Sequence, residues 1–170
     1  RETPMKKTLV TLTAVVCAIA VAAPAVLAAN VLQVRKSAEV DGKAADLWRT
    51  YGGFCAIADW HPAVAKCEES KEGDATFRTL TLGDGAKIKE KLTGTSEDGY
   101  TYQIIESPLP VKDYNASFSI RPDDEPNEAK ITWSATFMAK DKPDADAKGV
   151  IQGIFDAGVK SIVEKIEGKK

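Results

Sequence analysis

Hydrophobic residues alternate with polar ones along most of the chain and recur at helical spacing near its end. Alternation over four to eight residues is typical of half-buried strands. It predicts seven strands, at residues 31–40, 63–69, 76–82, 86–96, 100–106, 114–121 and 129–138. From Asp144 to the end, apolar residues recur every three or four positions with lysines and acids between them, which predicts one long amphipathic helix.

Two short helices are predicted between the first two strands. Asp41 is expected to cap the first helix, which carries Trp48 and is broken by Gly52-Gly53. The second helix holds Phe54 and Ile57. Short connections between the later strands predict antiparallel neighbours, and the apolar stripe of the last helix must be buried against the sheet. The pattern therefore predicts an α+β domain, in which a curved antiparallel sheet of about seven strands packs on a long C-terminal helix.

The first 28 residues have the pattern of a bacterial secretory signal peptide behind a short N-terminal extension. Met5-Lys6-Lys7 is a cationic start, residues 9–23 form an apolar run, and Val26-Leu27-Ala28 has the small residues of a cleavage site. No basic stop-transfer cluster follows the run, so we expect no stable membrane span after cleavage. Residues 29–170 are then expected to form a single exported domain, in the periplasm or outside the cell.

Charge and composition argue against several classes of site. The chain has 23 basic and 25 acidic side chains, and this slightly acidic balance disfavours nucleic acid as a partner. One histidine and the two cysteines left after cleavage are a poor set of zinc ligands. The sequence contains no glycine-rich phosphate loop and no nucleophile elbow. We therefore expect no metal and no cofactor.

The single histidine, His61, lies between Trp60 and Pro62, where the chain passes from the short helices into the second strand. Two interpretations remain open: a structural hydrogen-bonding histidine, which we favour, and a general acid or base. Cys55 and Cys67 flank the same corner. In an oxidising compartment they could form a disulfide, and the alternative is a pair of small buried hydrophobes.

A charge pair is predicted on the apolar face of one hairpin. A three-residue loop at Gly83-Asp84-Gly85 would pair Arg78 with Glu90. Period two places Leu80 and Leu92 on the same face as these two charges. The functional interpretation is a polar anchor for a ligand carboxylate or hydroxyl. The structural alternative is a cross-strand ion pair near the rim of the sheet.

Other groups are expected on or beside the same inner face. If Glu97-Asp98-Gly99 is also a three-residue turn, Gly94 faces Tyr102, and Tyr102 points inward, whereas a two-residue turn would reverse the strand. Alternation in the last strand places Trp133 inside. Pro108-Leu109-Pro110 is a stiff loop that would form one lip of an entrance.

The order of elements and several local motifs resemble the SRPBCC superfamily, which includes the START and birch-pollen-allergen proteins and has a helix-grip fold. Local sequence agrees with its bacterial polyketide cyclase/dehydrase-like branch, and an exported single-domain member is similar to MxaD-type periplasmic proteins. The motifs that carry the resemblance are Val40 with Leu47-Trp48, Trp60-His61-Pro62-Ala63-Val64, Arg78-Thr79-Leu80, Asp84-Gly85, Tyr102, Pro108-Leu109-Pro110 with Tyr114, Trp133-Ser134-Ala135, and Gly158.

The resemblance implies a ligand cavity between the sheet and the last helix. The residues expected to line it are Trp60, His61, Arg78, Leu80, Glu90, Leu92, Tyr102, Tyr114, Trp133 and Phe155. Three functions then compete. The favoured one is the binding of a small, largely apolar ligand. The second is a cyclase or dehydratase reaction, with His61 and Glu90 as the candidate catalytic groups. The third is contact with a periplasmic dehydrogenase or cytochrome, as an MxaD-like accessory protein.

Overall fold

The computed structural model describes residues 30–168 of the chain. The expected signal peptide and its cleavage site lie outside these residues. In chain order the elements are β1 (Leu32–Asp41), α1 (Ala44–Tyr51), α2 (Ile57–Trp60), β2 (Val64–Glu72), β3 (Ala75–Leu82), β4 (Lys87–Thr95), β5 (Gly99–Glu106), β6 (Val111–Pro122), β7 (Glu128–Ala139) and α3 (Asp144–Glu167). The number, type and order of elements that the hydrophobic pattern predicts are confirmed.

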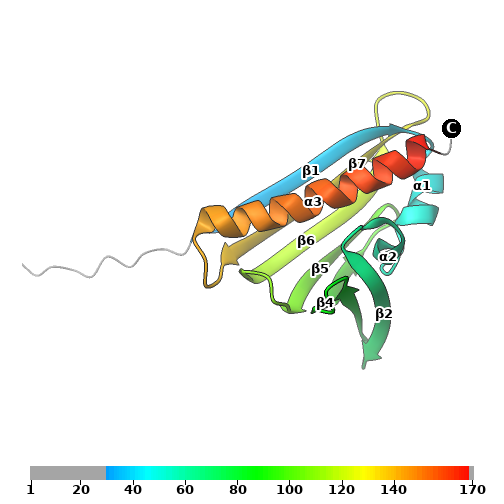
Figure 1. Ribbon diagram of the computed structural model, residues 1–170. Coiled ribbons are helices and arrows are strands. Elements are labelled where there is room, and N and C mark those ends of the chain that lie inside the picture. The colour runs from blue at the N-terminus through cyan, green and yellow to red at the C-terminus, as the bar shows by residue number, and fades with distance from the viewer. Residues whose placement is uncertain (1–29, 169–170) are drawn as a thin grey trace, which may run out of the picture.

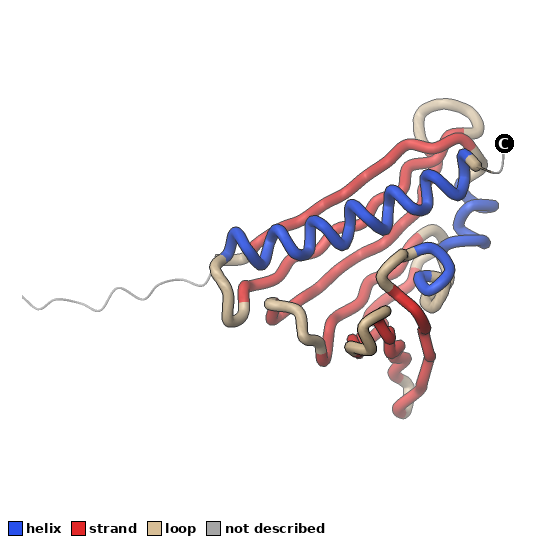
Figure 2. Tube along the Cα trace, viewed as in Figure 1, coloured by secondary structure: helices blue, strands red, loops and turns tan. Residues whose placement is uncertain are grey.

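The strands form one antiparallel sheet in the order β1-β7-β6-β5-β4-β3-β2. α3 lies along one face of the sheet, over β1 and β7, while β2 and the short helices lie where the sheet curls round (Figures 1 and 2). This is the helix-grip arrangement, in which a curved sheet encloses a helix. In the hairpin of β3 and β4, Arg78 faces Glu90, the register that the glycine turn predicts.

α3 is held against the sheet by its apolar stripe. Its buried residues are Ala147, Ile151, Phe155, Gly158, Val159, Ile162 and Ile166. Gly158 permits the closest approach, since a Cβ at this position would lie 2.7 Å from Cζ3 of Trp133 and 2.8 Å from Cδ2 of His61. The helix therefore reaches the sheet and the corner at His61 only because residue 158 has no side chain.

The start of α1 differs from the prediction that Asp41 caps it. β1 continues through Asp41, which pairs with Glu128 of β7. The helix starts at Ala44, and its N-cap residue, Lys43, makes no side-chain capping bond. Pairing with β7 therefore holds Asp41 in the sheet, two residues before the N-cap position.

The register of β4 and β5 also differs from the prediction. Tyr102 faces Leu92 rather than Gly94. The turn has two residues, Glu97-Asp98, and a β-bulge at Thr93 adds one unpaired residue to β4. The bulge offsets the shorter turn, and the Tyr102 side chain is still buried in the core.

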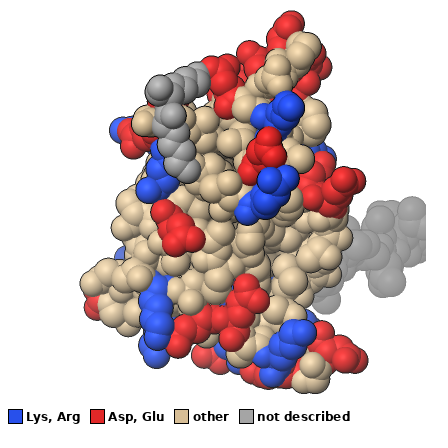
Figure 3. All heavy atoms as spheres, turned by 90° about the vertical axis from the view of Figure 1, so that its right-hand side faces the viewer, with Lys and Arg blue, Asp and Glu red and all other residues tan. Residues whose placement is uncertain are grey.

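Figure 3 shows the end of the molecule that carries α1, α2 and β2. Lysine, arginine, aspartate and glutamate side chains are interspersed there around an uncharged central area. This face has no concentrated basic surface of the kind that binds nucleic acid. None of the helices in the described part of the chain has the length and hydrophobicity needed to cross a bilayer.

Candidate functional site

A cavity of about 70 Å³ lies between the curled end of the sheet, α3 and the loop that precedes β6. Strands β3 to β7 provide most of its wall, and two isoleucines of α3 close it. Its lining consists of Ile57, His61, Ala63, Val64, Leu80, Leu82, Ile88, Glu90, Tyr102, Ile104, Leu109, Tyr114, Trp133, Ile151 and Ile154. The wall is thus aliphatic and aromatic, with Glu90 as its one acidic group.

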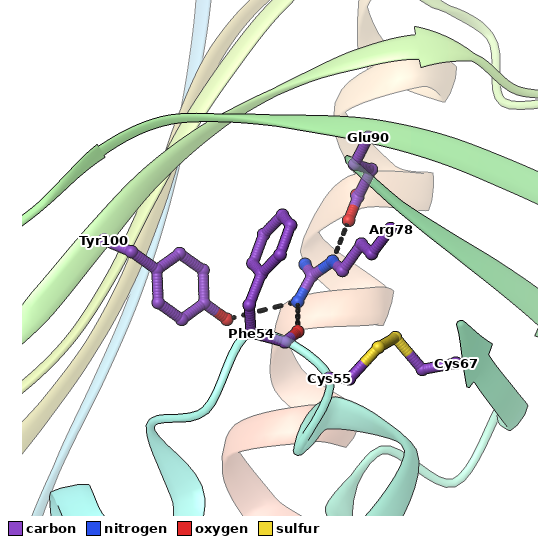
Figure 4. The surroundings of a disulfide bond; sticks show 6 residues. All are labelled: Phe54, Cys55, Cys67, Arg78, Glu90 and Tyr100. Atoms are coloured by element: carbon purple, nitrogen blue, oxygen red, sulfur yellow. Dashed lines mark hydrogen bonds and ion pairs between the residues drawn. A yellow bond between two sulfur atoms is a disulfide. The ribbon is translucent and has the colours of Figure 1, made fainter. Parts of the chain in front are cut away.

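Arg78 and Glu90 form a buried ion pair beside this cavity (Figure 4). Arg78 is 0% exposed and Glu90 is 5% exposed, so the pair does not lie at the rim of the sheet. Nε of Arg78 donates to Oε2 of Glu90 at 2.5 Å. Nη1 donates to the carbonyl oxygen of Phe54 and lies 3.4 Å from the hydroxyl of Tyr100. Arg78 therefore braces the segment before α2 against strands β4 and β5.

Aromatic rings surround the rest of the Arg78 guanidinium. Its central carbon lies 4.2 Å from the ring centre of Phe54, 4.9 Å from that of Tyr102 and 5.6 Å from that of Tyr100. Nη2 has no hydrogen-bond partner among residues 30–168, and the negative faces of these rings supply the compensating attraction. The guanidinium is therefore held behind the cavity wall, and only Glu90 of the pair contributes to the lining.

Burial sets the charge state of this pair. Burial raises the pKa of the Glu90 carboxyl, and the charge of Arg78 offsets part of that rise. Burial on its own would lower the pKa of Arg78, but attraction to Glu90, Tyr100 and Tyr102 and the hydrogen bond to Glu90 together outweigh it, and the pKa is raised. Because the arginine stays charged, the carboxylate is the form of Glu90 that completes the pair.

Two tyrosines and a tryptophan form the aromatic part of the wall. Nε1 of Trp133 donates to the hydroxyl oxygen of Tyr102 at 2.9 Å. The ring of Tyr102 lies 6.2 Å from the ring of Tyr114. Burial raises the pKa of both phenols. Tyr102 and Tyr114 are therefore neutral over the physiological pH range.

His61 uses both ring nitrogens within the fold. Nδ1 accepts a hydrogen bond from the backbone N–H of Ala63 at 3.2 Å. Nε2 must then carry the proton, and it donates to the carbonyl oxygen of Ile154 in α3 at 3.0 Å. Burial lowers the pKa of the imidazole, which keeps it neutral. The lone pair of Nδ1 is therefore already used, and His61 links the corner to α3 by hydrogen bonds, as the structural interpretation expects.

A disulfide joins Cys55 and Cys67, with their Cα atoms 5.4 Å apart. It ties the segment just before α2 to β2, next to the Phe54 carbonyl that Arg78 holds (Figure 4). Two independent links, the disulfide and the hydrogen bond from the charged Arg78 guanidinium, thus fix this wall of the cavity. The described residues include no group of three or more His, Cys, Asp or Glu side chains placed to hold a metal ion.

Six of the ten residues expected to line the cavity do so: His61, Leu80, Glu90, Tyr102, Tyr114 and Trp133. The other four lie elsewhere. Trp60 donates from Nε1 to the carbonyl of Tyr51 and stacks on Phe118, which places it deeper in the core. Arg78 is enclosed behind the wall by Phe54, Tyr100 and Tyr102.

Leu92 and Phe155 are the remaining two residues outside the lining. Leu92 is half-buried and lies next to the bulge in β4. Phe155 stacks on Trp133 with 4.3 Å between ring centres. This contact places Phe155 in the packed core behind Trp133.

The lining residues absent from the expected set are all aliphatic. They are Ile57, Ala63, Val64, Leu82, Ile88, Ile104, Leu109, Ile151 and Ile154. Leu82 and Ile88 follow from the same alternation that identifies Leu80, and Leu109 lies in the expected lip. Ile151 and Ile154 belong to the apolar face of α3, but that pattern alone does not distinguish cavity walls from packed core.

A family model described as "Polyketide cyclase / dehydrase and lipid transport" matches residues 31–167. Among solved structures, the protein XoxI from Bacillus cereus is 28% identical with a TM-score of 0.75, over 79% of this chain and 95% of that one. No curated protein matches the chain.

Two less identical structures share the fold. A START superfamily protein from Mycobacterium smegmatis is 16% identical, with a TM-score of 0.68 over 81% of this chain and 99% of that one. The Zhui aromatase/cyclase from Streptomyces sp. R1128 is 13% identical, with a TM-score of 0.66 over 82% of this chain and 96% of that one. At these identities, the two similarities concern the fold alone.

Proposed function

Since the chain belongs to the family of polyketide cyclases, dehydrases and lipid-transport proteins, we propose that it binds a small, largely apolar ligand in the cavity between the sheet and α3. The observation that carries the proposal is a single buried carboxylate, Glu90, set in an otherwise aliphatic and aromatic wall. Binding sites of small molecules commonly combine apolar walls with a few placed polar groups.

The volume of the cavity limits the size of the ligand. An apolar protein cavity of about 150 Å³ holds benzene, whereas this one measures about 70 Å³. It therefore has room for a molecule of about three or four heavy atoms by the same comparison. A larger ligand would require the Leu109 loop or the isoleucines of α3 to move apart.

The polar groups of the wall favour a ligand that donates a hydrogen bond. The ionised carboxylate of Glu90 only accepts. His61 has both nitrogens engaged. The hydroxyl oxygen of Tyr102 accepts from Trp133, and the neutral phenols of Tyr102 and Tyr114 keep their protons, so a ligand that donates to Glu90 and also accepts fits the wall. A short alcohol or amine matches this arrangement, whereas a ligand carboxylate would face the like charge of Glu90.

Titration of the isotope-labelled protein with 1-propanol and with propionate, followed by methyl NMR, tests this proposal. We expect saturable shifts in the methyl groups of the cavity with 1-propanol, and at least ten-fold weaker binding of propionate. Leu82→Phe should fill the cavity and weaken propanol binding at least ten-fold. Ile105→Phe, the matched change at a residue that is 46% exposed on the same sheet, should leave binding unchanged.

Equal binding of propionate would contradict the role of Glu90. Undiminished binding of propanol by Leu82→Phe would contradict the site itself. The apolar side chain of Leu82 takes no part in the hydrogen bonds of Arg78 and Glu90. The variant therefore tests the cavity while the buried ion pair stays intact.

A cyclase or dehydratase reaction is the second candidate function, and the position of Glu90 supports it. A buried carboxyl whose pKa is raised and that lines a cavity has the properties of a general acid or base. Glu90→Gln should then abolish turnover of a cyclisable substrate while binding of that substrate persists. Full activity of this variant would remove Glu90 from the mechanism.

Export to the periplasm and contact with a dehydrogenase or cytochrome there are further proposals, which the N-terminal pattern of the sequence supports. We expect the mature protein in the periplasmic fraction, with Ala29 at its N-terminus. N-terminal sequencing of the fractionated protein tests export. Affinity capture of a periplasmic dehydrogenase or cytochrome tests the partner.

A further inference from the structure

A second hollow, separate from the ligand cavity, is lined mainly by strand residues that alternate with the buried ones, so it lies on the face of the sheet turned away from α3. Its volume is about 520 Å³. The residues that line it are Arg35, Gly94, Thr95, Ser96, Gly99, Tyr100, Thr101, Ser117, Phe118, Ser119, Arg121, Pro122, Lys130, Thr132 and Ser134. We call this hollow the outer groove.

Glycines and a bulge help to make the groove concave. Gly94 follows the β-bulge in β4 and faces Thr101, and a Cβ on it would lie 3.0 Å from the Thr101 hydroxyl oxygen. Gly99 faces Ser119, and a Cβ there would lie 3.1 Å from the Ser119 Cβ. Side chains at these two positions would crowd the groove. The bulge bends the strand further.

Hydroxyl groups form its floor in cross-strand rows. In the first row, Ser134 of β7 faces Ser117 of β6, which faces Thr101 of β5. In the next row, Thr132 faces Ser119. The hydroxyls of Ser117 and Ser134 lie 2.9 Å apart, and either one can be the donor. Such a surface can both donate to and accept from the hydroxyl groups of a ligand.

Every charged residue that lines the groove is a cation. Arg35 continues the first row, next to Ser134, and Lys130 and Arg121 form a third row at the other end. Arg35 makes no ion pair with the residues that the structure describes. The other two cations are in ion pairs: Lys130 with Glu39 and, at 3.8 Å, with Asp123, and Arg121 with Asp98. Pairs of this kind contribute roughly 0 to 1 kcal/mol, so a bound anion can replace them.

The spacing of the cations indicates an extended ligand. Residues two apart on a strand are roughly 7 Å apart, so the first and third rows are separated by roughly 14 Å. A single small anion cannot reach both ends of the groove, whereas a short chain of sugar units can. The two aromatic residues of the lining, Tyr100 and Phe118, are buried, so no exposed ring is available to stack on a nucleobase.

From these observations we propose that the outer groove binds an acidic oligosaccharide, with carboxylates at the cations and sugar hydroxyls on the serine and threonine rows. The charge of the lining supplies the attraction to the carboxylates, and the hydroxyl rows distinguish a sugar from a simple anion. This site is independent of the proposed ligand cavity, because the sheet separates the two.

Titration of the ¹⁵N-labelled protein with trigalacturonate, maltotriose and sodium sulfate, at equal ionic strength, tests this proposal. We expect trigalacturonate to give saturable shifts at the backbone amides of Thr101, Ser117, Ser119 and Thr132. Maltotriose, a neutral trisaccharide, should bind at least ten-fold more weakly. Sulfate should not reproduce the shifts on the hydroxyl rows.

Variants of exposed cations make the test specific to the groove. Arg35→Gln and Arg121→Gln should each weaken trigalacturonate binding at least five-fold. Lys112→Gln, which removes an exposed cation of β6 outside the groove, should leave it unchanged. The proposal is overturned if trigalacturonate fails to bind, if its shifts map to another face, if Arg35→Gln has no effect, or if sulfate alone produces the same shifts.

Discussion

At the scale of single residues, the buried polar side chains of the core have different roles. His61 bonds through Nδ1 to the backbone of its own corner and through Nε2 to α3, and Arg78 braces a loop against two strands. Of the buried ion pair, only Glu90 faces the cavity, which His61 also lines. The buried polar groups therefore serve mainly to hold the wall of the cavity in place, and the Glu90 carboxylate is the one that a ligand can reach.

The neutral state of His61 predicts a dependence of stability on pH. Burial lowers the pKa of His61 below its ordinary value of 6.5, so the unfolded chain takes up a proton that the folded protein does not. The contribution of His61 to stability is then fully present above about pH 6.5 and is lost as the pH falls through the folded-state pKa.

NMR of untagged protein measures this pKa directly, because the chain contains one histidine. We expect the Hε1 resonance of His61 to titrate with a midpoint below 6.5. Denaturant unfolding of the wild type should show a fall in the free energy of unfolding as the pH drops below about 6.5. In His61→Gln this fall should be smaller, because the imidazole that takes up the proton is gone. A midpoint at or above 6.5 would contradict the buried, neutral assignment.

The Arg78 and Glu90 pair predicts an asymmetry between single and double substitutions. Arg78→Met should lower the free energy of unfolding by about 3 to 5 kcal/mol at pH 7, because it leaves a buried carboxylate without its partner. Arg78→Met with Glu90→Met should cost less than Arg78→Met alone, because no uncompensated charge remains. Guanidinium unfolding measures both. A double variant less stable than Arg78→Met would show that the Arg78 and Glu90 pair stabilises the fold by more than charge compensation.

At the scale of elements, α3 combines glycines of opposite kinds. Gly153 is exposed, and a Cβ built on it meets nothing within 4 Å. Gly158 is buried, and its Cβ would lie 2.7 Å from the Trp133 ring. Gly153 therefore weakens the helix without any packing reason for a glycine. Gly158 is required, because a side chain there would keep the helix from reaching the sheet.

Alanine substitutions should therefore have opposite signs. Gly153→Ala should raise the free energy of unfolding by about 0.5 to 1 kcal/mol, because alanine loses less backbone entropy in a helix. Gly158→Ala should lower it by about 1 to 3 kcal/mol through overpacking against Trp133. Thermal and denaturant unfolding of the two variants checks both signs. A stabilising Gly158→Ala would show that α3 is not seated against the sheet as described.

Elements also show where the sequence is sufficient for prediction. The pairing of Arg78 with Glu90 follows from the glycines of the β3–β4 turn and from alternation on each side. The pairing of Leu92 with Tyr102 does not, because the bulge at Thr93 leaves no mark in the hydrophobic pattern. Likewise, alternation places Trp133 inside, but only the structure shows that Phe155 stacks on it and lies outside the cavity lining.

At the scale of the whole molecule, the curved sheet presents two surfaces of different chemistry. Its inner face, with α3, encloses a small apolar cavity that contains one carboxylate. Its outer face carries the hydroxyl rows and cations of the outer groove. The family membership concerns the fold that creates both faces. The size and polarity of the cavity then determine which ligands fit, and these properties belong to this chain.

The most direct test of the central claim is a measurement of intermolecular NOEs between 1-propanol and the methyl groups of the protein. The account predicts NOEs from the propanol methyl group to Leu80, Ile88 and Ile151, which line the cavity from two strands and from α3. NOEs confined to exposed residues such as Ile105 or Val150, or none to the cavity at saturating propanol, would contradict it.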